Sequence, residues 1–371
     1  MYKRQEFHRL LPNGTIKTSP GNPLLKSKTY ELEDPLAVQE YFHSRRWTDG
    51  LPVVAPTPQS VQEMLDRANL DPEHLIGIEP VRNRRMTAEK LAVNAVMAGC
   101  LPDHFPLVCE SFSAMLKEPF LLHGATASTG GCAVLVVING PVREQLGMCG
   151  TFNVLGSSDR ATTVIGRAIR LILCNLLDAR PGDLDRSTLG HPGKFSYCIA
   201  EDEEHTEWLS LAEDRAMPRG TSAVTVMAAG SPRQIMNEWT TEPEAILDTF
   251  VAEMKACMRH YSIWPGNYAI IIPPQLRTHF EKAGWSKKDI RKYVFEHARI
   301  QRKEWADCGK ASVIGSQGEQ EYAALTDEDH LLVIAAGGPA GGFGAVIPPW
   351  FGTKSKAVTQ ALGVCLDCGP Q

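Results

Sequence analysis

Residues 134–147 read VLVVINGPVREQLG, and residues 269–284 read AIIIPPQLRTHFEKAG. Both stretches begin with an apolar run of strand length, turn at proline, continue into a helical segment that carries an arginine, and stop at glycine. A strand followed directly by a helix is the repeating unit of α/β folds. We therefore expect an α/β fold of two lobes built from mostly parallel βα units. The repeat suggests an internal duplication, although two unrelated βα units would give the same pattern.

Hydrophobic periodicity predicts the elements around these stretches. Helices are expected over residues 34–47, 60–68, 88–98, 102–117, 244–258 and 287–299, and further strands over residues 223–228 and 330–336. The start of the chain is polar and rich in proline, as in an extended arm. We expect an arm and first helix at residues 1–48, a first α/β lobe at 49–215, and a second lobe at 216–371 with a C-terminal CxxC tail.

Composition limits the function classes. The chain has 371 residues and a net charge of −5, which argues against a nucleic-acid-binding protein. No apolar run has membrane-spanning length, and the first residues show no signal-peptide core. The ten cysteines are scattered rather than paired at framework spacing, as in a reducing compartment. We expect a cytoplasmic protein without nucleic-acid or membrane partners, and a homo-oligomer by default.

Residues 147–177, GMCGTFNVLGSSDRATTVIGRAIRLILCNLL, suggest a seat for a small anion. A glycine-rich loop containing Gly156 leads into an apolar helix, with N-cap candidates at Ser157 and Ser158. Arg160 and Arg167 are seven residues apart on one face of that helix. Free N–H groups at a helix start, together with guanidinium groups, bind carboxylate or phosphate. A capped core helix with solvated arginines is the structural alternative. The pattern is neither a P-loop nor a dinucleotide fingerprint, so no nucleotide cofactor is indicated.

Cys132 ends the loop HGATASTGGC, at the entrance to a predicted buried strand. A thiol near a histidine can act as a nucleophile, whereas a small buried hydrophobic residue would also fit there. We expect His123 and Thr129 of this loop to contact the substrate.

His191 and Lys194 lie in the loop GHPGK, where glycine and proline hold a defined shape. Such a loop suits a positioned general base, and Lys194 suits an anion clamp or a Schiff-base amine. An exposed histidine in an ordinary turn is the alternative. We take His191, Cys132 and Lys194 as the catalytic candidates.

Three other segments carry possible chemistry. The acidic run at residues 201–204, with His205, could hold a metal or supply a base. A run of carboxylates more often forms a solvent-exposed face of the protein. The glycine-rich residues 337–344 follow a predicted strand, where backbone N–H groups can bind anions. Cys365 and Cys368 form a terminal CxxC that could exchange electrons, or be a chance spacing. No zinc-binding pattern is present, and the sequence leaves the metal content open.

Seven segments together resemble a bacterial family associated with UGSC-motif (seleno)proteins. They are DGLPVVAPTP, AVNAVMAGCLPDHFPLV, VINGP, RATTVIGRAIRLIL, LGHPGKFSYCIAEDEE, GWSKKDIRKYVFEHAR and GGPAGGFGAVIPPW, and they span most of the chain between Asp49 and Trp350. The resemblance implies thiol or selenol chemistry nearby, in a UGSC-type partner. This chain has no U-G-S-C or C-G-S-C motif, so no redox centre carries over to its residues.

Together these features predict an enzyme that binds a small anionic metabolite between its lobes and acts on it by acid/base and thiol-linked chemistry. The reaction would be a cleavage or a reduction. Two alternatives remain open at this point: an accessory ligand-binding subunit of a UGSC-type redox system, and a metal-dependent hydrolase or lyase.

Overall fold

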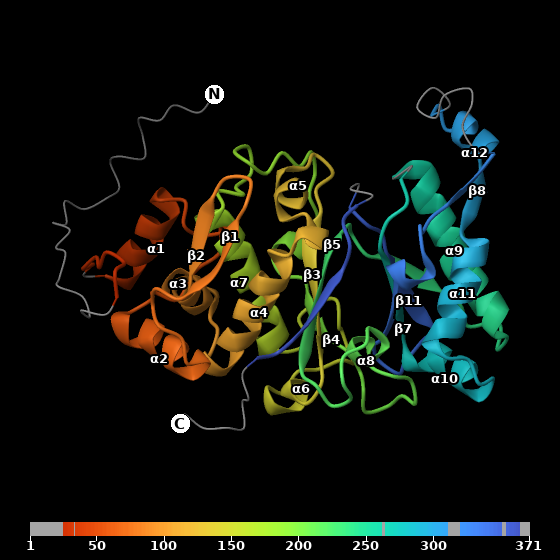
Figure 1. The fold of residues 1–371 in the computed structure, drawn as a ribbon, viewed down its shortest axis with the longest axis horizontal. Coiled ribbons are helices and arrows are strands. Elements are labelled where there is room, and N and C mark those ends of the chain that lie inside the picture. The colour runs from red at the N-terminus through yellow and green to blue at the C-terminus, as the bar shows by residue number, and fades with distance from the viewer. Residues whose placement is uncertain (1–24, 33, 262–263, 311–319, 351–353, 364–371) are drawn as a thin grey trace.

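The protein folds into four layers, helix–sheet–sheet–helix, in which two sheets pack face to face between two groups of helices (Figure 1). The computed structural model describes residues 25–32, 34–261, 264–310, 320–350 and 354–363. Cys365 and Cys368 lie outside these ranges, so the expected redox tail stays a prediction. Within the described ranges, no helix combines the length and the apolar character that crossing a membrane requires.

The first sheet has the strand order β12-β5-β3-β4. Its central strands are β3 (Ala133–Asn139) and β5 (Ala223–Ala229), which pair antiparallel along their whole length. β4 (Cys198–Ala200) lies parallel to β3, and β12 (Val358–Ala361) lies antiparallel to β5.

The second sheet has the order β10-β7-β11-β6. β10 (Leu331–Ala335) lies parallel to β7 (Tyr268–Ile272). β11 (Phe343–Ile347) is antiparallel to β7 and to the edge strand β6 (Arg233–Met236).

The two sheets therefore have the same order and the same strand directions, with β4, β3, β5 and β12 matching β10, β7, β11 and β6. Each sheet takes its antiparallel edge strand, β6 or β12, from the segment of chain that follows a strand of the other sheet. β6 follows β5 in the chain but joins the second sheet, and β12 follows β11 but joins the first.

The strands are apolar on both faces because each sheet is covered on both sides. In β7, Ala269 and Ile271 belong to the core between the sheets, whereas Tyr268, Ile270 and Ile272 belong to the core under the helices. This is the period-2 alternation of a strand, with both sets of side chains buried. Among the described residues, apolar side chains thus fill the space between the two sheets, and they leave no ligand cleft there of the kind expected between two lobes.

Helices form the outer layers. α4 (Phe105–Met115) and α7 (Arg160–Leu176) contact the first sheet, and α2 (Pro58–Ala68) and α3 (Ala88–Ala98) pack against them. The second sheet is covered by α9 (Pro243–His260) and α11 (Lys287–His297), with α10 (Pro274–Lys282) beside α9. The remaining named elements are α1 (Pro35–Ser44), α5 (Leu122–Ala127), α6 (Val142–Gln145), α8 (Leu211–Asp214), α12 (Arg302–Asp307), β1 (Leu75–Glu79), β2 (Arg84–Thr87), β8 (Arg299–Gln301) and β9 (Glu321–Ala323).

The α/β class is as expected, but the strand directions are not. Six strand pairings in the described residues are antiparallel and two are parallel, so the expectation of mostly parallel strands is wrong. The chain also does not separate into the two sheets at residue 215, since β5 and β12, which both follow that residue, complete the sheet that contains β3. Finally, the last residues of the glycine-rich segment 337–344 belong to β11.

Candidate functional site

The start of α7 is not a free anion seat, because a side chain of the protein already occupies it. The N-cap is Asp159, not Ser157 or Ser158. Its carboxylate accepts hydrogen bonds from the N–H groups of Thr162 (2.8 Å) and Cys149 (3.0 Å) and from the Ser158 hydroxyl (3.1 Å). Gly156 and Ser158 therefore lie in a loop that builds this cap. A negative charge at the helix start satisfies the N–H groups that would otherwise bind a ligand.

The two arginines expected to hold the anion have other partners. Arg160 is exposed and donates to the Gly99 carbonyl (3.0 Å). Arg167 donates two hydrogen bonds of 2.9 Å to the Asp49 carboxylate, and a third to the Pro52 carbonyl. Burial alone would raise the pKa of Asp49, but the Arg167 guanidinium brings it below its usual value. Arg167 thus fastens residues 49–52 to α7.

A cleft of about 630 Å³ lies close by, between the turn after α1 and residues 180–195. Its cationic lining residues are Arg46, Arg170, Arg180 and Lys194, and its carboxylate is Asp49, which is bound to Arg167. His191 also lines it, so two of the three catalytic candidates from the sequence share this cleft. The cleft adjoins the N-terminal ends of β3 and β4, the edge opposite the one expected to bind ligands in an α/β sheet.

Positive charge exceeds negative charge around this cleft. The ion pairs that include a residue lining the cleft are Arg46–Asp183, Arg180–Asp178, Arg167–Asp49, Arg170–Asp185 and Lys194–Asp185. Five cations therefore share four carboxylates, a surplus of one positive charge. A concave surface with such a surplus attracts small anions.

Lys194 is held in place by a buried carboxylate. Its ammonium donates to Asp185 (2.6 Å) and to the Ser187 hydroxyl (2.8 Å), while Arg170 approaches the same carboxylate at 3.4 Å. Burial would raise the pKa of Asp185, but the hydrogen bonds from Lys194 and Ser187 lower it. Asp185 thus stays ionised and positions two cationic groups of the cleft.

His191 is the N-cap of a 3-10 turn, Pro192–Lys194, and both of its ring nitrogens have partners. Nδ1 accepts from the Gly193 N–H (3.2 Å), so the proton is on Nε2, which donates to the Ala229 carbonyl at 3.3 Å. Burial and the nearby Lys194 lower the pKa of His191. The ring is therefore neutral near pH 7. This arrangement suits a hydrogen-bond donor better than the general base expected from the sequence.

Cys132 lies next to the cleft but is not a nucleophile in this state. It lines a small pocket that shares Arg170 and Lys194 with the cleft. Its thiol is buried and donates to the Ala125 carbonyl (3.1 Å). Burial raises the pKa of Cys132 to about 12, although the nearby Lys194 partly opposes the rise. A reactive cysteine needs the opposite shift.

The other two expected substrate contacts do not line this cleft. His123 lies on α5, with its Nδ1 atom 4.0 Å from the Glu79 carboxylate. Thr129 is exposed, and its carbonyl accepts from the Thr188 N–H (3.1 Å). Thr129 therefore contributes to the site by tying the loop before β3 to the loop that carries His191.

The first half of the acidic run after β4 is buried, against the expectation of a solvated face. Glu201 and Asp202 are each 1% exposed. The Glu201 carboxylate accepts from Lys287 (2.6 Å), Asn139 (2.6 Å) and the Ala335 N–H (3.0 Å). It therefore joins the ends of β3, β4 and β10 with α11, and it connects the two sheets.

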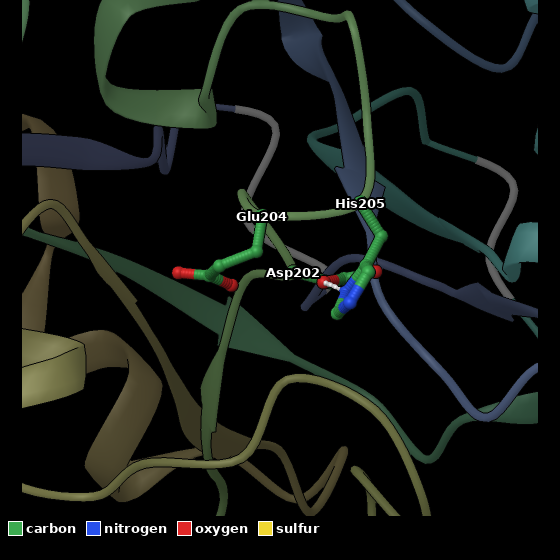
Figure 2. A group of neighbouring side chains, drawn as sticks. All are labelled: Asp202, Glu204 and His205. Atoms are coloured by element: carbon green, nitrogen blue, oxygen red, sulfur yellow. Dashed lines mark hydrogen bonds and ion pairs between the residues drawn. The ribbon is translucent and has the colours of Figure 1, made fainter.

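Asp202, Glu204 and His205 are close enough for their ligand atoms to share a metal ion, since those atoms lie within 4.8 Å of one another. In Figure 2 the His205 ring meets Asp202, with an Nδ1–Oδ1 distance of 2.7 Å, while Glu204 extends away from them. Asp202 also binds Arg277 (3.0 Å), and Glu204 binds Arg143 (2.8 Å). Both carboxylates thus already neutralise a guanidinium, which weakens their attraction for a cation.

The glycine-rich loop after β10 does not present a row of free N–H groups. The Gly337 N–H donates to the Gly150 carbonyl (2.9 Å), and the Gly342 N–H donates to Glu238 (2.7 Å). The loop therefore packs on the glycine-rich segment before α7 rather than forming an anion nest.

Sequence reasoning did not include Arg46 and Arg180 in the site, and it noted Arg170 only as a neighbour of Arg167 on its helix. Arg170 lies one helical turn beyond Arg167, so its position on α7 was a usable signal. Arg46 and Arg180 flank turns, and nothing local distinguishes them from surface arginines.

A scan against models of protein families finds no match for this chain, and a search of curated proteins finds none either. The fold and the cleft thus define an α/β protein with a basic, ligand-sized cleft.

Proposed function

We propose that the protein is an enzyme that binds a small carboxylate or phosphate metabolite in the basic cleft and stabilises negative charge on it. The observation that carries the proposal is the surplus of cations there. Arg170, Arg180 and Lys194 have side chains that are only 13–17% exposed, so their charges are poorly screened by solvent. A cleft with this positive surplus suits an anion such as a dicarboxylate or a phosphate.

His191 would add a neutral donor to this electrostatic site. Its bond to the Ala229 carbonyl is long, so a substrate oxygen could take over the Nε2–H. A fixed N–H donor beside fixed cations stabilises an oxyanion without rearranging solvent, which is a strong catalytic effect. We therefore assign charge stabilisation, rather than proton abstraction, to His191.

Thiol chemistry has less support within the described residues. Burial keeps Cys132 protonated, and the resemblance places the redox-active group in a partner rather than in this chain. The accessory-subunit alternative shares the same anion site and differs only in lacking turnover. The metal-dependent alternative is disfavoured by the arginines on Asp202 and Glu204.

Calorimetric titration with malonate and with phosphate tests the binding site. We expect one bound anion per chain, and Arg170→Gln and Arg180→Gln should each weaken binding about tenfold, or ~1.4 kcal/mol. Arg186→Gln is the matched control, since Arg186 is exposed and does not line the cleft. Absence of binding by the wild-type protein, or equal loss in all three variants, would refute the proposal. If Arg160→Gln weakened anion binding instead, the binding site would lie at the start of α7.

Turnover needs a separate test. The protein is incubated with pooled small carboxylates and phosphate esters, and depletion is followed by mass spectrometry. Depletion by the wild type but not by Arg170→Gln supports the enzyme; anion binding without depletion of any pooled compound supports the accessory subunit.

We also propose that the chain contains two copies of one structural unit. The equal order and directions of the two sheets support this, as does the match of residues 134–147 with 269–284, which form β3–α6 and β7–α10.

A further inference from the structure

A second cavity, of about 520 Å³, lies beside the N-terminal part of the described chain and is separate from the basic cleft. Residues 25–32, α1, α2 and α3 surround it. The turn after α1 forms a wall common to both spaces, since Trp47 lines the cavity and Arg46 lines the cleft. The volume is that of a typical small-molecule site.

Aromatic side chains form one side of this cavity. Tyr30, Tyr41, Phe42 and Trp47 all line it. The ring centroids of Tyr30, Tyr41 and Trp47 lie 5.5–5.9 Å apart, so each ring supports the others. Val93 and Met97 of α3 add aliphatic surface. A preformed aromatic and aliphatic wall favours a flat, apolar ligand.

The polar groups of the cavity are consistent with an uncharged ligand. Two charged side chains line it, Lys28 and Glu89. Lys28 is exposed, and the Glu89 carboxylate is held by the N–H groups of Lys26 and Ser27 at 2.7–3.1 Å. Within the described chain, neither the Trp47 indole N–H nor the Tyr30 hydroxyl donates a hydrogen bond. The cavity thus offers donors, and its buried carboxylate is already engaged by backbone N–H groups.

From these contacts we infer a second binding site, for a small neutral aromatic molecule that carries a hydrogen-bond acceptor. The rings and α3 enclose the body of the ligand, and the Trp47 N–H and the Tyr30 hydroxyl receive its acceptor. This inference does not depend on the function proposed for the basic cleft.

The test uses the full chain and a neutral fluorescent probe, N-phenyl-1-naphthylamine, which brightens in apolar surroundings. We expect saturable binding of one probe per chain. Val93→Trp fills the cavity and should abolish the signal. Leu36→Trp is the matched control, because Leu36 is 74% exposed on α1 and does not line the cavity. Thermal melting identifies any variant that fails to fold, and Val38→Phe, a smaller filling change in the same cavity, then replaces Val93→Trp.

A pair of competitors of similar shape tests the predicted acceptor. 2-Acetylnaphthalene should displace the probe at about three- to tenfold lower concentration than 2-ethylnaphthalene, as expected for one hydrogen bond. In a Trp47→Phe, Tyr30→Phe double variant the difference should vanish. The site is overturned if the wild type shows no saturable probe binding, or if a folded variant with a filled cavity binds the probe equally well. The ligand class is overturned if the two naphthalenes compete equally in the wild type.

Discussion

Arg143 and Arg277 bind the same short segment, residues 201–205, although their helices follow strands of different sheets. Arg143 on α6, after β3, binds Glu203 and Glu204 and the Glu201 carbonyl. Arg277 on α10, after β7, binds Asp202 and the His205 carbonyl. Because β3 and β7 occupy matching positions in their sheets, two matching arginines hold one loop at the junction of the sheets.

The Arg277–Asp202 pair should be important for stability. Both side chains are 1% exposed, so Arg277→Met would leave a buried carboxylate without its main partner. We expect a loss of about 3–5 kcal/mol in the free energy of unfolding, measured with urea. Arg233→Met is the control, because the side chains of the Arg233–Glu253 pair are 37% and 25% exposed and the pair should be worth less than about 1 kcal/mol. Equal effects of the two changes would contradict this prediction.

Asp185 should contribute to stability in a pH-dependent way. Its pKa is lowered in the folded protein from an ordinary value of 3.8. A lowered carboxyl pKa stabilises the fold above that ordinary value, and the contribution is lost as the pH falls through the folded-state pKa. Asp185→Asn should therefore be clearly less stable than the wild type at pH 7, with a difference that shrinks below about pH 4. A difference that stays constant down to the acid transition would show that the carboxylate charge is not responsible.

Cys132 should resist alkylation in the folded protein. With a pKa of about 12, on the order of one molecule in ten thousand carries the thiolate at pH 8, and burial limits access further. Cys149 is partly exposed and serves as the internal comparison. Peptide mass spectrometry after brief iodoacetamide treatment should find Cys149 labelled well before Cys132. Rapid labelling of Cys132 would show that its thiol is reactive and would support its role as a nucleophile.

His191 should act through its N–H and not through protonation. Its lowered pKa keeps the ring neutral above its ordinary value of 6.5. Malonate affinity should therefore be nearly constant between pH 6.5 and 8, where malonate itself stays ionised. His191→Gln keeps an N–H donor and should bind malonate within about twofold of the wild type, whereas His191→Ala should lose about three- to tenfold. A steep fall in wild-type affinity across this pH range would point instead to a protonated imidazole.

Much of the fold could be predicted locally. The residues of β7 and α3 follow from periodicity. Strand direction could not be predicted, because pairing depends on partners far along the chain. β4, β6 and β12 are too short to stand out from their surroundings.

The candidate site was predictable in part for a similar reason. His191 and Lys194 do line one cleft, with Cys132 beside it, because one compact loop and the start of one strand bring them there. Arg160 and Arg167 were expected to bind an anion, but other parts of the chain are their partners. Arg167 is bound by Asp49, 118 positions away in the chain, and no local pattern reveals that contact.

The exchanged strands β6 and β12 mean that neither half of the chain is complete alone. A fragment ending before α9 would leave β5 without its outer neighbour and would carry β6 with no strand to pair with. The complementary fragment would expose the open edge of β11, a surface that invites association with other chains. The protein should therefore unfold as one cooperative body, and its two halves, if separated, should recover a soluble form only when they are mixed.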